Sequence, residues 1–367
     1  MHDLIIIGGG LAGLTAAIHL SREGREVVLF EKEEFPHHKV CGEYLSSEVL
    51  PYLNDLDLDL YELGPARIKK LQFSTREGRE INAPLPLGGL GISRYALDFY
   101  LYQKALEAGV RILPQKVLEV AFAQRNFEVT TTAGTYRALQ VFGAFGKRSI
   151  LDKKLRRRFF NSPSQWVAIK QHYENQEFPE DMVGLHNFRG GYCGLSRTET
   201  GRVNVCYLAS YKSFKRHGNA EDFLNHEIRR NPYLDRFFSR AEPIFDKPLA
   251  IAQISFSKKE RTLDQMLMIG DAAALIHPLS GNGMAMAIHS GKLASEAYLN
   301  HLKDRQAMAA QYRKSWNRSF SRRLAAGMLL QRVLLNERAS GISQRMLSMV
   351  PFLMPELIRM THGKPIK

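Results

Sequence analysis

The sequence predicts an α/β fold: a parallel-sheet domain, an antiparallel sheet inserted into it, and a helical C-terminal segment. Three observations lead to this prediction. A strand, a glycine-rich turn and a helix follow one another directly near the N-terminus. A second strand leads into a glycine-rich loop and a helix around residues 266–291. Short runs of alternating apolar and polar residues lie between these regions, and such alternation is typical of antiparallel strands.

The composition is that of an ordinary globular protein. The 367 residues are 44% hydrophobic and 24% charged, which is enough to bury a large core. Cys41, Cys193 and Cys206 are too few and too scattered for a disulfide framework, which favours a reducing compartment. The chain enters an apolar strand without a basic leader region, and no apolar run approaches the ~20 residues that span a bilayer. We therefore expect a cytoplasmic location.

The formal net charge of +14 indicates an anionic partner, such as nucleic acid, a membrane surface or a phosphate-rich cofactor. Basic residues cluster at 153–158 and along 305–323, although solvated helix faces give the same pattern. We expect no nucleic-acid partner. A peripheral contact between the basic 305–323 stretch and the inner face of a membrane is kept as a hypothesis.

Residues 4–31 follow the pattern of a dinucleotide-binding unit. After the apolar strand, Gly8 makes a tight turn, Gly10 lets the backbone approach a pyrophosphate, and Gly13 lets the helix pack on the strand. The helix N-terminus offers free N–H groups to phosphates. Glu31 ends the second strand, where a carboxylate accepts hydrogen bonds from ribose hydroxyls. An acid here favours FAD or NAD over NADP. The expected cofactor contacts are Gly8, Gly10, Leu11, Ala12, Gly13, Glu31 and Lys32.

The stretch LMIGDAAALIHPLSGNGMAMAIHSG, residues 267–291, indicates which dinucleotide binds. NAD needs no second glycine-rich helix start so far along the chain, whereas FAD extends well beyond the first unit. We expect Asp271 to bind a ribityl hydroxyl. The backbone around Gly281 to Met284 is expected to face the N1–C2=O edge of the flavin, where reduced flavin carries negative charge. The expected contacts are Gly270, Asp271, Pro278, Gly281, Asn282, Gly283 and Met284.

These two motifs together resemble the FAD-binding aromatic hydroxylase superfamily over roughly residues 1–300. The superfamily includes aromatic-ring monooxygenases, flavin-dependent halogenases and geranylgeranyl reductases. The second motif is similar to the pattern G-D-A-A-x-x-x-x-P-x-x-G-x-G of that superfamily. The resemblance implies an FAD-dependent oxidoreductase with a Rossmann-like, three-layer FAD-binding domain of the glutathione-reductase type.

Further segments are similar to that superfamily. Arg94 begins the segment RYALDFYLYQKALEAGV and by resemblance lies near the FAD pyrophosphate; Val117 is a further expected cofactor contact. VFGAFGKRS, residues 141–149, resembles G-A-D-G-x-x-S, but Phe145 stands where the acid is expected. In hydroxylases that acid shapes the path of the nicotinamide cofactor. Because the acid is absent here, another electron donor is an alternative to NAD(P)H as the reductant.

The stretch FPHHKVCGE, residues 35–43, suggests a metal or thiol site when it is taken alone. His37 and His38 are adjacent and would point apart, and no second cluster supplies partners, so we expect no metal. The stretch leaves the carboxyl end of the second strand, where ligands bind in such sheets. It resembles the K-x-C-G segment of geranylgeranyl reductases, through Lys39, Cys41 and Gly42. The resemblance implies that this segment runs beside the flavin, with Cys41 as a pocket-lining and candidate catalytic residue.

We expect residues 1–70, 94–160 and 262–302 to form the FAD-binding domain, and residues 71–93 and 161–261 the substrate-binding domain. Residues 303–367 are expected to form a helical cap, whose apolar end MLSMVPFLMPELI suits a lid or a membrane contact. The substrate is expected to be a hydrophobic small molecule, such as an isoprenoid, polyketide or aromatic compound. His186, Tyr192 and Tyr207 are candidates for its pocket.

Two reactions fit these features. In the first, reduced flavin passes a hydride to a C=C bond in a dry pocket. In the second, a flavin C4a-hydroperoxide hydroxylates an aromatic or polyketide substrate. Halogenation is a weaker alternative, because the stretch W-x-W-x-I-P is absent and the two tryptophans, Trp166 and Trp316, stand far apart. The K-x-C-G segment favours the reductase.

Overall fold

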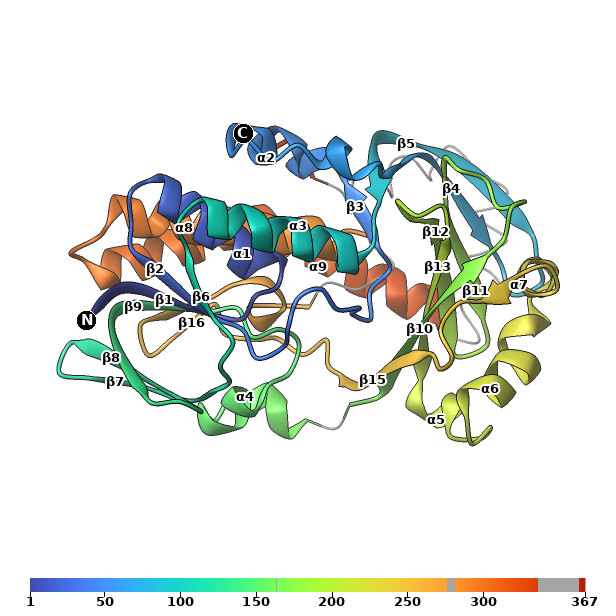
Figure 1. Ribbon diagram of the computed structural model, residues 1–367. Coiled ribbons are helices and arrows are strands. Elements are labelled where there is room, and N and C mark those ends of the chain that lie inside the picture. Colours follow the sequence, from blue (N-terminus) through green and yellow to red (C-terminus); the bar gives the residue numbers. More distant parts are fainter. Residues whose placement is uncertain (163, 276–280, 336–362, 367) are drawn as a thin grey trace.

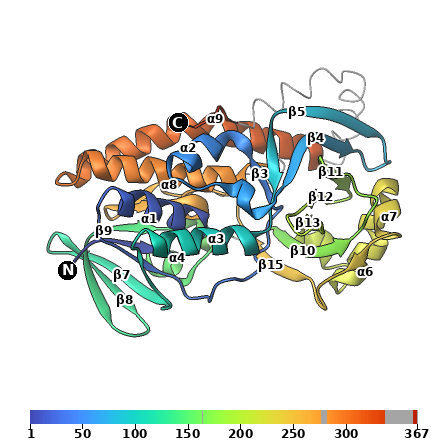
Figure 2. The same ribbon diagram turned by 45° about the horizontal axis from the view of Figure 1, so that its top comes forward.

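Two sheets organise the molecule (Figure 1). We describe a computed structural model, which places residues 1–162, 164–275, 281–335 and 363–366. The sheet near the N-terminus is mainly parallel, and the other sheet is mainly antiparallel. This arrangement confirms the predicted α/β fold with an antiparallel second sheet. Figure 2 shows α8 and α9 running along the parallel-sheet side toward the second sheet.

The parallel sheet is built on the N-terminal strand. Its order is β16-β17-β9-β1-β2-β6, and every pairing from β17 to β6 is parallel. Helices α1, α3 and α8 cover one face, and the β7–β8 hairpin lies on the opposite side (Figure 1). The bounds are β1 His2–Ile7, β2 Val27–Phe30, β6 Arg111–Leu113, β7 Val117–Ala123, β8 Asn126–Thr131, β9 Thr135–Gly143, β16 Thr262–Leu263, β17 Met266–Met268, α1 Leu11–Arg22, α3 Arg94–Glu107, α4 Ile150–Lys154 and α8 Gly283–Asn300.

The second sheet has the order β14-β10-β13-β12-β11-β4-β5-β3, with β15 paired to β10. Helices α5, α6 and α7 cover one of its faces, and the other face meets the FAD-domain side of the molecule (Figure 1). Strand β3 and residues 66–70 of β4 belong to this sheet, although residues 1–70 were expected in the FAD-binding domain. The bounds are β3 Tyr44–Ser46, β4 Ala66–Ser74, β5 Glu80–Gly91, β10 Trp166–Glu174, β11 Met182–Phe188, β12 Gly191–Arg197, β13 Val203–Ser210, β14 Glu242–Pro243, β15 Leu249–Ile254, α5 Tyr211–Phe214, α6 Ala220–His226 and α7 Pro232–Phe238.

The short helix α2 (Leu50–Asp55) follows β3, and the long helix α9 (Arg305–Leu335) follows α8. Helix α9 buries Tyr312, Trp316 and Phe320 at one-turn spacing against the FAD-domain core. No helix among the placed residues is both long and apolar enough to cross a bilayer. The apolar stretch predicted as a lid or membrane contact, MLSMVPFLMPELI, lies outside the described residues.

Candidate functional site

Two glycines of the first motif, Gly8 and Gly13, stand where no larger residue fits. Gly8 has φ of +112°, and a Cβ on it would lie 2.4 Å from the carbonyl oxygen of Ala144. A Cβ on Gly13 would lie 2.0 Å from the carbonyl oxygen of Gly8. Gly10 precedes α1, and no side chain caps that helix. The free N–H groups at this end therefore remain available for an anion.

Glu31 joins the end of β2 to the glycine turn. Its Oε2 accepts a hydrogen bond from the N–H of Gly9 at 2.7 Å, and its Oε1 accepts one from the N–H of Lys32 at 2.8 Å. The acid therefore lies beside the turn, as a ribose-binding carboxylate requires. The side chain of Lys32 is exposed and pairs with Glu33 at 2.8 Å.

The second motif packs directly on the first. A Cβ on Gly270 would lie 3.0 Å from Cβ of Ala12, and the N–H of Gly270 donates to Oγ of Ser290 at 2.7 Å. Asp271 is half-buried in the turn that follows. Ala12 of α1 thus brings the two glycine-rich segments, which are far apart in sequence, to one place.

Asn282, Gly283 and Met284 form the start of α8. Asn282 is buried, and its Nδ2 donates to Glu48 at 3.1 Å, while its Oδ1 has no hydrogen-bond partner among the described residues. Gly281 has φ of +60° and approaches the ring of Tyr44. Pro278 lies outside the described residues.

Arg94 lies close to the N-terminal end of α1. A Cβ on Gly10 would come within 3.8 Å of its Nη2. The guanidinium donates to both carboxylate oxygens of Asp98, each at 2.7 Å, and Nζ of Lys39 also binds Asp98 at 2.7 Å. Burial would raise the pKa of Asp98, but Arg94 and Lys39 outweigh it and lower the pKa. Asp98 thus stays ionised and holds the cations Arg94 and Lys39 in place, with Arg94 next to the glycine turn.

Lys259 is a buried residue that the sequence motifs did not reveal. Its Nζ donates to the carbonyl oxygens of Lys147 and Asp271, each at 2.7 Å. Burial lowers the pKa of Lys259 to about 8. The lysine therefore ties the loop after β9 to the second glycine-rich segment.

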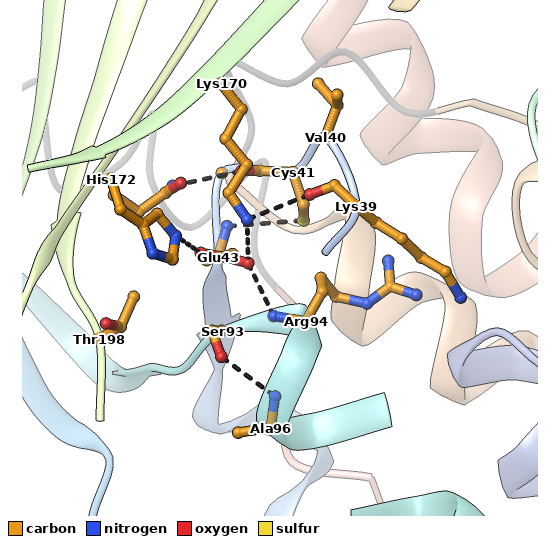
Figure 3. Close-up of polar contacts among 12 residues, drawn as sticks. Lys39, Val40, Cys41, Glu43, Ser93, Arg94, Ala96, Lys170, His172 and Thr198 are labelled. Carbon is orange, nitrogen blue, oxygen red and sulfur yellow. Dashed lines mark hydrogen bonds and ion pairs between the residues drawn. The ribbon is translucent and has the colours of Figure 1, made fainter. Parts of the chain in front are cut away.

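The carbonyl oxygens of the segment from Lys39 to Glu43 all accept hydrogen bonds, and Figure 3 shows the one from Lys170 to the carbonyl of Lys39. The carbonyl oxygens of residues 39, 40, 41 and 42 accept hydrogen bonds from Nζ of Lys170, Nζ of Lys147, Nδ2 of Asn204 and Oγ of Ser196, at 3.2, 3.2, 3.2 and 2.9 Å. The carbonyl of residue 43 accepts one from the N–H of Ile92 at 3.1 Å. Three of these donors come from the second sheet, so the segment bridges both parts of the molecule.

Glu43 is the centre of this contact. Its side chain is fully buried, Oε1 binds Nζ of Lys170 at 2.5 Å and the N–H of Arg94 at 2.7 Å, and Oε2 binds Nε2 of His172 at 2.7 Å (Figure 3). Burial would raise the pKa of Glu43, but the hydrogen bond from His172 and the charge of Lys170 outweigh it and lower the pKa. Lys170 and His172 are two residues apart in β10, so both project from the same face, and their bonds to Glu43 show that this face meets it.

The donor atoms of His38, Glu43 and His172 lie within 4.8 Å of one another. The sequence predicts no metal site, because no second cluster supplies ligands beside His37 and His38. The fold, however, brings His172, which lies 129 residues from Glu43 in the chain, next to Glu43. Two imidazoles and a carboxylate suit zinc in their chemistry. However, Lys170 already holds one carboxylate oxygen and places a positive charge in the same buried space, so we interpret the group as a hydrogen-bonded cluster.

Cys41 is half-buried, and its Sγ accepts a long hydrogen bond from the N–H of Glu43 at 3.5 Å. A Cβ on Gly42 would meet no atom of the described residues within 4 Å, so they leave space open beside the backbone there. Val117, at the start of β7, packs in the core of the FAD domain.

The three candidate substrate residues do not share one face. Tyr192 packs with Tyr44 in the cluster on the side of the second sheet that meets the Lys39–Glu43 segment. Tyr207 stacks on Phe223 on the helix-covered face. His186 is buried, bonds Oγ of Ser74 at 2.9 Å and stacks on Tyr233. Tyr192 is thus the candidate placed toward the segment.

The residues fit FAD. The uncapped start of α1, the cations Arg94 and Lys39, and Glu31 suit the adenosine and pyrophosphate part. The unpaired Oδ1 of Asn282 and the open space beside Gly42 suit the flavin end. Lys170, His172, Asn204 and Ser196 were missed in the sequence, although polar residues at every second position of buried strands were a signal for them.

Comparisons with known proteins agree with this site. Residues 3–78 match the family model described as FAD dependent oxidoreductase. The chain is 27% identical over 315 residues to menaquinone reductase of Mycobacterium tuberculosis, covering 80% of this chain and 76% of the relative. It is 26% identical to digeranylgeranylglycerophospholipid reductase 2 of Methanothermobacter thermautotrophicus, covering 91% and 88%.

Among solved structures, a flavin-dependent brominase superposes with a TM-score of 0.81 at 22% identity, covering 98% of this chain and 93% of that chain. This likeness concerns the fold. The glycine-rich site, the family match and these relatives together identify the chain as an FAD-dependent oxidoreductase.

Proposed function

We propose that the protein uses FAD to reduce a C=C bond of a hydrophobic small molecule. The observation that carries this proposal is the Lys39–Glu43 segment. It is fixed between the FAD-binding motifs and the second sheet, and it presents a half-buried Cys41 beside open space. The relatives named as reductases, at 26–27% identity over most of the chain, support the same reaction class.

FAD supplies the hydride when it is bound. The chain must hold the cofactor, place the double bond against it, and exclude water. Arg94 and the start of α1 would hold the pyrophosphate, and Asn282 would bind at the flavin end. The Lys39–Glu43 segment borders the space between cofactor and substrate. Each of its carbonyls already accepts one hydrogen bond from the protein, which leaves fewer acceptor sites for water.

A groove gives a hydrophobic substrate room to lie beside Tyr44. Its volume is about 630 Å³. Part of its described lining is apolar, with Leu85, Pro86, Leu87 and Ala326, and part is basic, with Arg318, Arg322, Arg323 and Lys364. Tyr44 lines the groove and also contacts the loop at Gly281. The groove therefore extends from the predicted flavin end of the site, which suits a long apolar molecule.

Product mass distinguishes this reaction from monooxygenation. The reduced holoenzyme is incubated without oxygen with an unsaturated polyprenyl quinone or with a lipid extract, and the products are analysed by mass spectrometry. The proposal predicts a gain of two hydrogen atoms without oxygen. A product that forms only in air and gains one oxygen atom would establish the hydroxylase instead.

A further inference from the structure

Four exposed cations lie together on α4 and the turn that follows it. They are Lys153, Lys154, Arg156 and Arg158. Within the described part of the chain, none of them forms an ion pair with an acid. The neighbouring acids, Asp152 and Glu260, both pair with the buried Arg157, at 2.9 and 3.0 Å. The charge of these four side chains therefore remains directed outward.

A hollow lies next to the residues that follow Arg158 in the chain, because Phe160 and Asn161 contribute to its lining. Its volume is about 410 Å³, and Arg148, Phe160, Trp166 and Tyr211 contribute to its lining. Tyr211 is 49% exposed, and Ile150 on the neighbouring helix α4 is 46% exposed. Aromatic residues surrounded by charge are typical of the centre and rim of a protein–protein interface. We call the four cations and this hollow the basic face.

The basic face is connected to the cofactor motifs by one short loop. The loop 143–149 contacts Gly8 through Ala144, and its Lys147 binds the carbonyl of Val40 at 3.2 Å. The loop ends at Ser149, whose hydroxyl caps α4. Phe145, which replaces the expected acid, lies in the same loop. The residues that contact the FAD-binding turn thus lead directly into the cationic helix.

We propose that the basic face docks a small acidic electron-carrier protein, which reduces the bound FAD. Two molecules of a one-electron carrier are oxidised, and FAD takes up their two electrons together with protons from water. The charge spreads over a helix and a turn rather than a closed cleft, which suits a protein surface better than a nucleotide. The net charge of +14 would also attract an acidic partner over distance. The inference holds for either reaction, because both need reduced flavin.

The test measures reduction of the holoenzyme flavin under anaerobic conditions. The probe is a reduced, acidic [2Fe–2S] ferredoxin, and NADH and NADPH are tried separately. One variant removes the four cations: Lys153→Gln, Lys154→Gln, Arg156→Gln and Arg158→Gln. The control removes the same charge elsewhere on the exposed surface: Lys69→Gln, Arg111→Gln, Lys116→Gln and Lys303→Gln. Flavin content and melting temperature verify that both variants fold.

We expect the second-order rate constant with ferredoxin to fall at least about tenfold in the basic-face variant and about twofold or less in the control. The wild-type rate should fall as salt rises. A zero-length carbodiimide cross-linker should join ferredoxin carboxylates to Lys153 or Lys154. Equal losses in both variants would overturn the proposal, because net charge alone would then explain them. Absence of reduction by ferredoxin, with rapid reduction by NADH or NADPH, would also overturn it.

Discussion

Nζ of Lys170 lies 2.5 Å from Oε1 of Glu43, and neither side chain has any exposed surface. The lysine belongs to the second sheet, while the glutamate ends the segment that carries Cys41. This ion pair therefore fixes the distance between the substrate-side sheet and the proposed reaction centre. We expect loss of this ion pair to change both the packing of the second sheet and the position of the Lys39–Glu43 segment.

Lys170→Met should destabilise the protein by about 3–5 kcal/mol, because it leaves the Glu43 carboxylate buried without its cation. Adding Glu43→Gln should recover part of that loss. Chemical denaturation of the holoenzyme measures both. The control is Lys70→Met, whose partner Asp181 is 37% exposed and whose loss should cost at most about 1 kcal/mol. If Lys170→Met and Lys70→Met lowered the free energy of unfolding equally, the buried pair would contribute no more to stability than the exposed pair.

Cys41 should be the thiol that reacts first with iodoacetamide in the native protein. Cys41 and Cys206 are half-buried and Cys193 is buried, but burial of the thiol raises the pKa of Cys206 to about 12 and also raises that of Cys193. Peptide mapping after timed alkylation at pH 8 gives the order. Asn204→Ala, which frees the carbonyl of Cys41, should change the rate at Cys41 alone. Labelling of Cys206 as fast as Cys41 would contradict the described packing.

Gly42→Ala should weaken FAD binding without destabilising the apoprotein. A Cβ there would meet no atom of residues 1–162, 164–275, 281–335 or 363–366 within 4 Å, so we expect it to contact the cofactor instead. Flavin titration and the melting temperature of the apoprotein separate the two effects. Gly194→Ala is the matched control, since its Cβ would make an ordinary contact at 3.5 Å. If Gly42→Ala bound FAD as tightly as the wild type, the segment would not run beside the flavin.

Stability should decrease as the pH falls below about 6.5. Burial lowers the pKa of His186 and of His289 to about 3 each, so the unfolded chain takes up protons that the folded chain refuses. Each group should cost up to about 1.4 kcal/mol per pH unit between 6.5 and its folded pKa. Urea unfolding at pH 7.5 and 5.0 measures the loss, and His186→Gln should reduce it. An unchanged loss in His186→Gln would exclude this histidine as a source.

The cofactor motifs could be predicted because their parts are consecutive. Gly8, Gly13 and Glu31 lie within one strand–helix–strand unit, so local spacing alone indicates their arrangement. The Glu43 cluster could not, because Lys170 and His172 lie 127 and 129 residues away from Glu43. Alternation in β10 predicts which face they occupy, but the residue that faces them is set by how two sheets pack.

The substrate candidates show the same limit. Tyr192 and Tyr207 come from adjacent antiparallel strands, and a one-residue difference in register decides which face each occupies. The sequence around these two tyrosines does not reveal which face each one occupies, and their roles in substrate binding stay predictions. Tyr192 lies on the side of the sheet that meets the Lys39–Glu43 segment, so it is the candidate to substitute first.

Anaerobic single turnover tests the central claim most directly. The holoenzyme is reduced chemically, freed of excess reductant and mixed with the unsaturated substrate in the absence of oxygen, while flavin absorbance and substrate mass are followed. The account predicts that the flavin is reoxidised and that one substrate molecule gains two hydrogen atoms per flavin. A flavin that stays reduced until oxygen enters, with a product that then gains an oxygen atom, would contradict it.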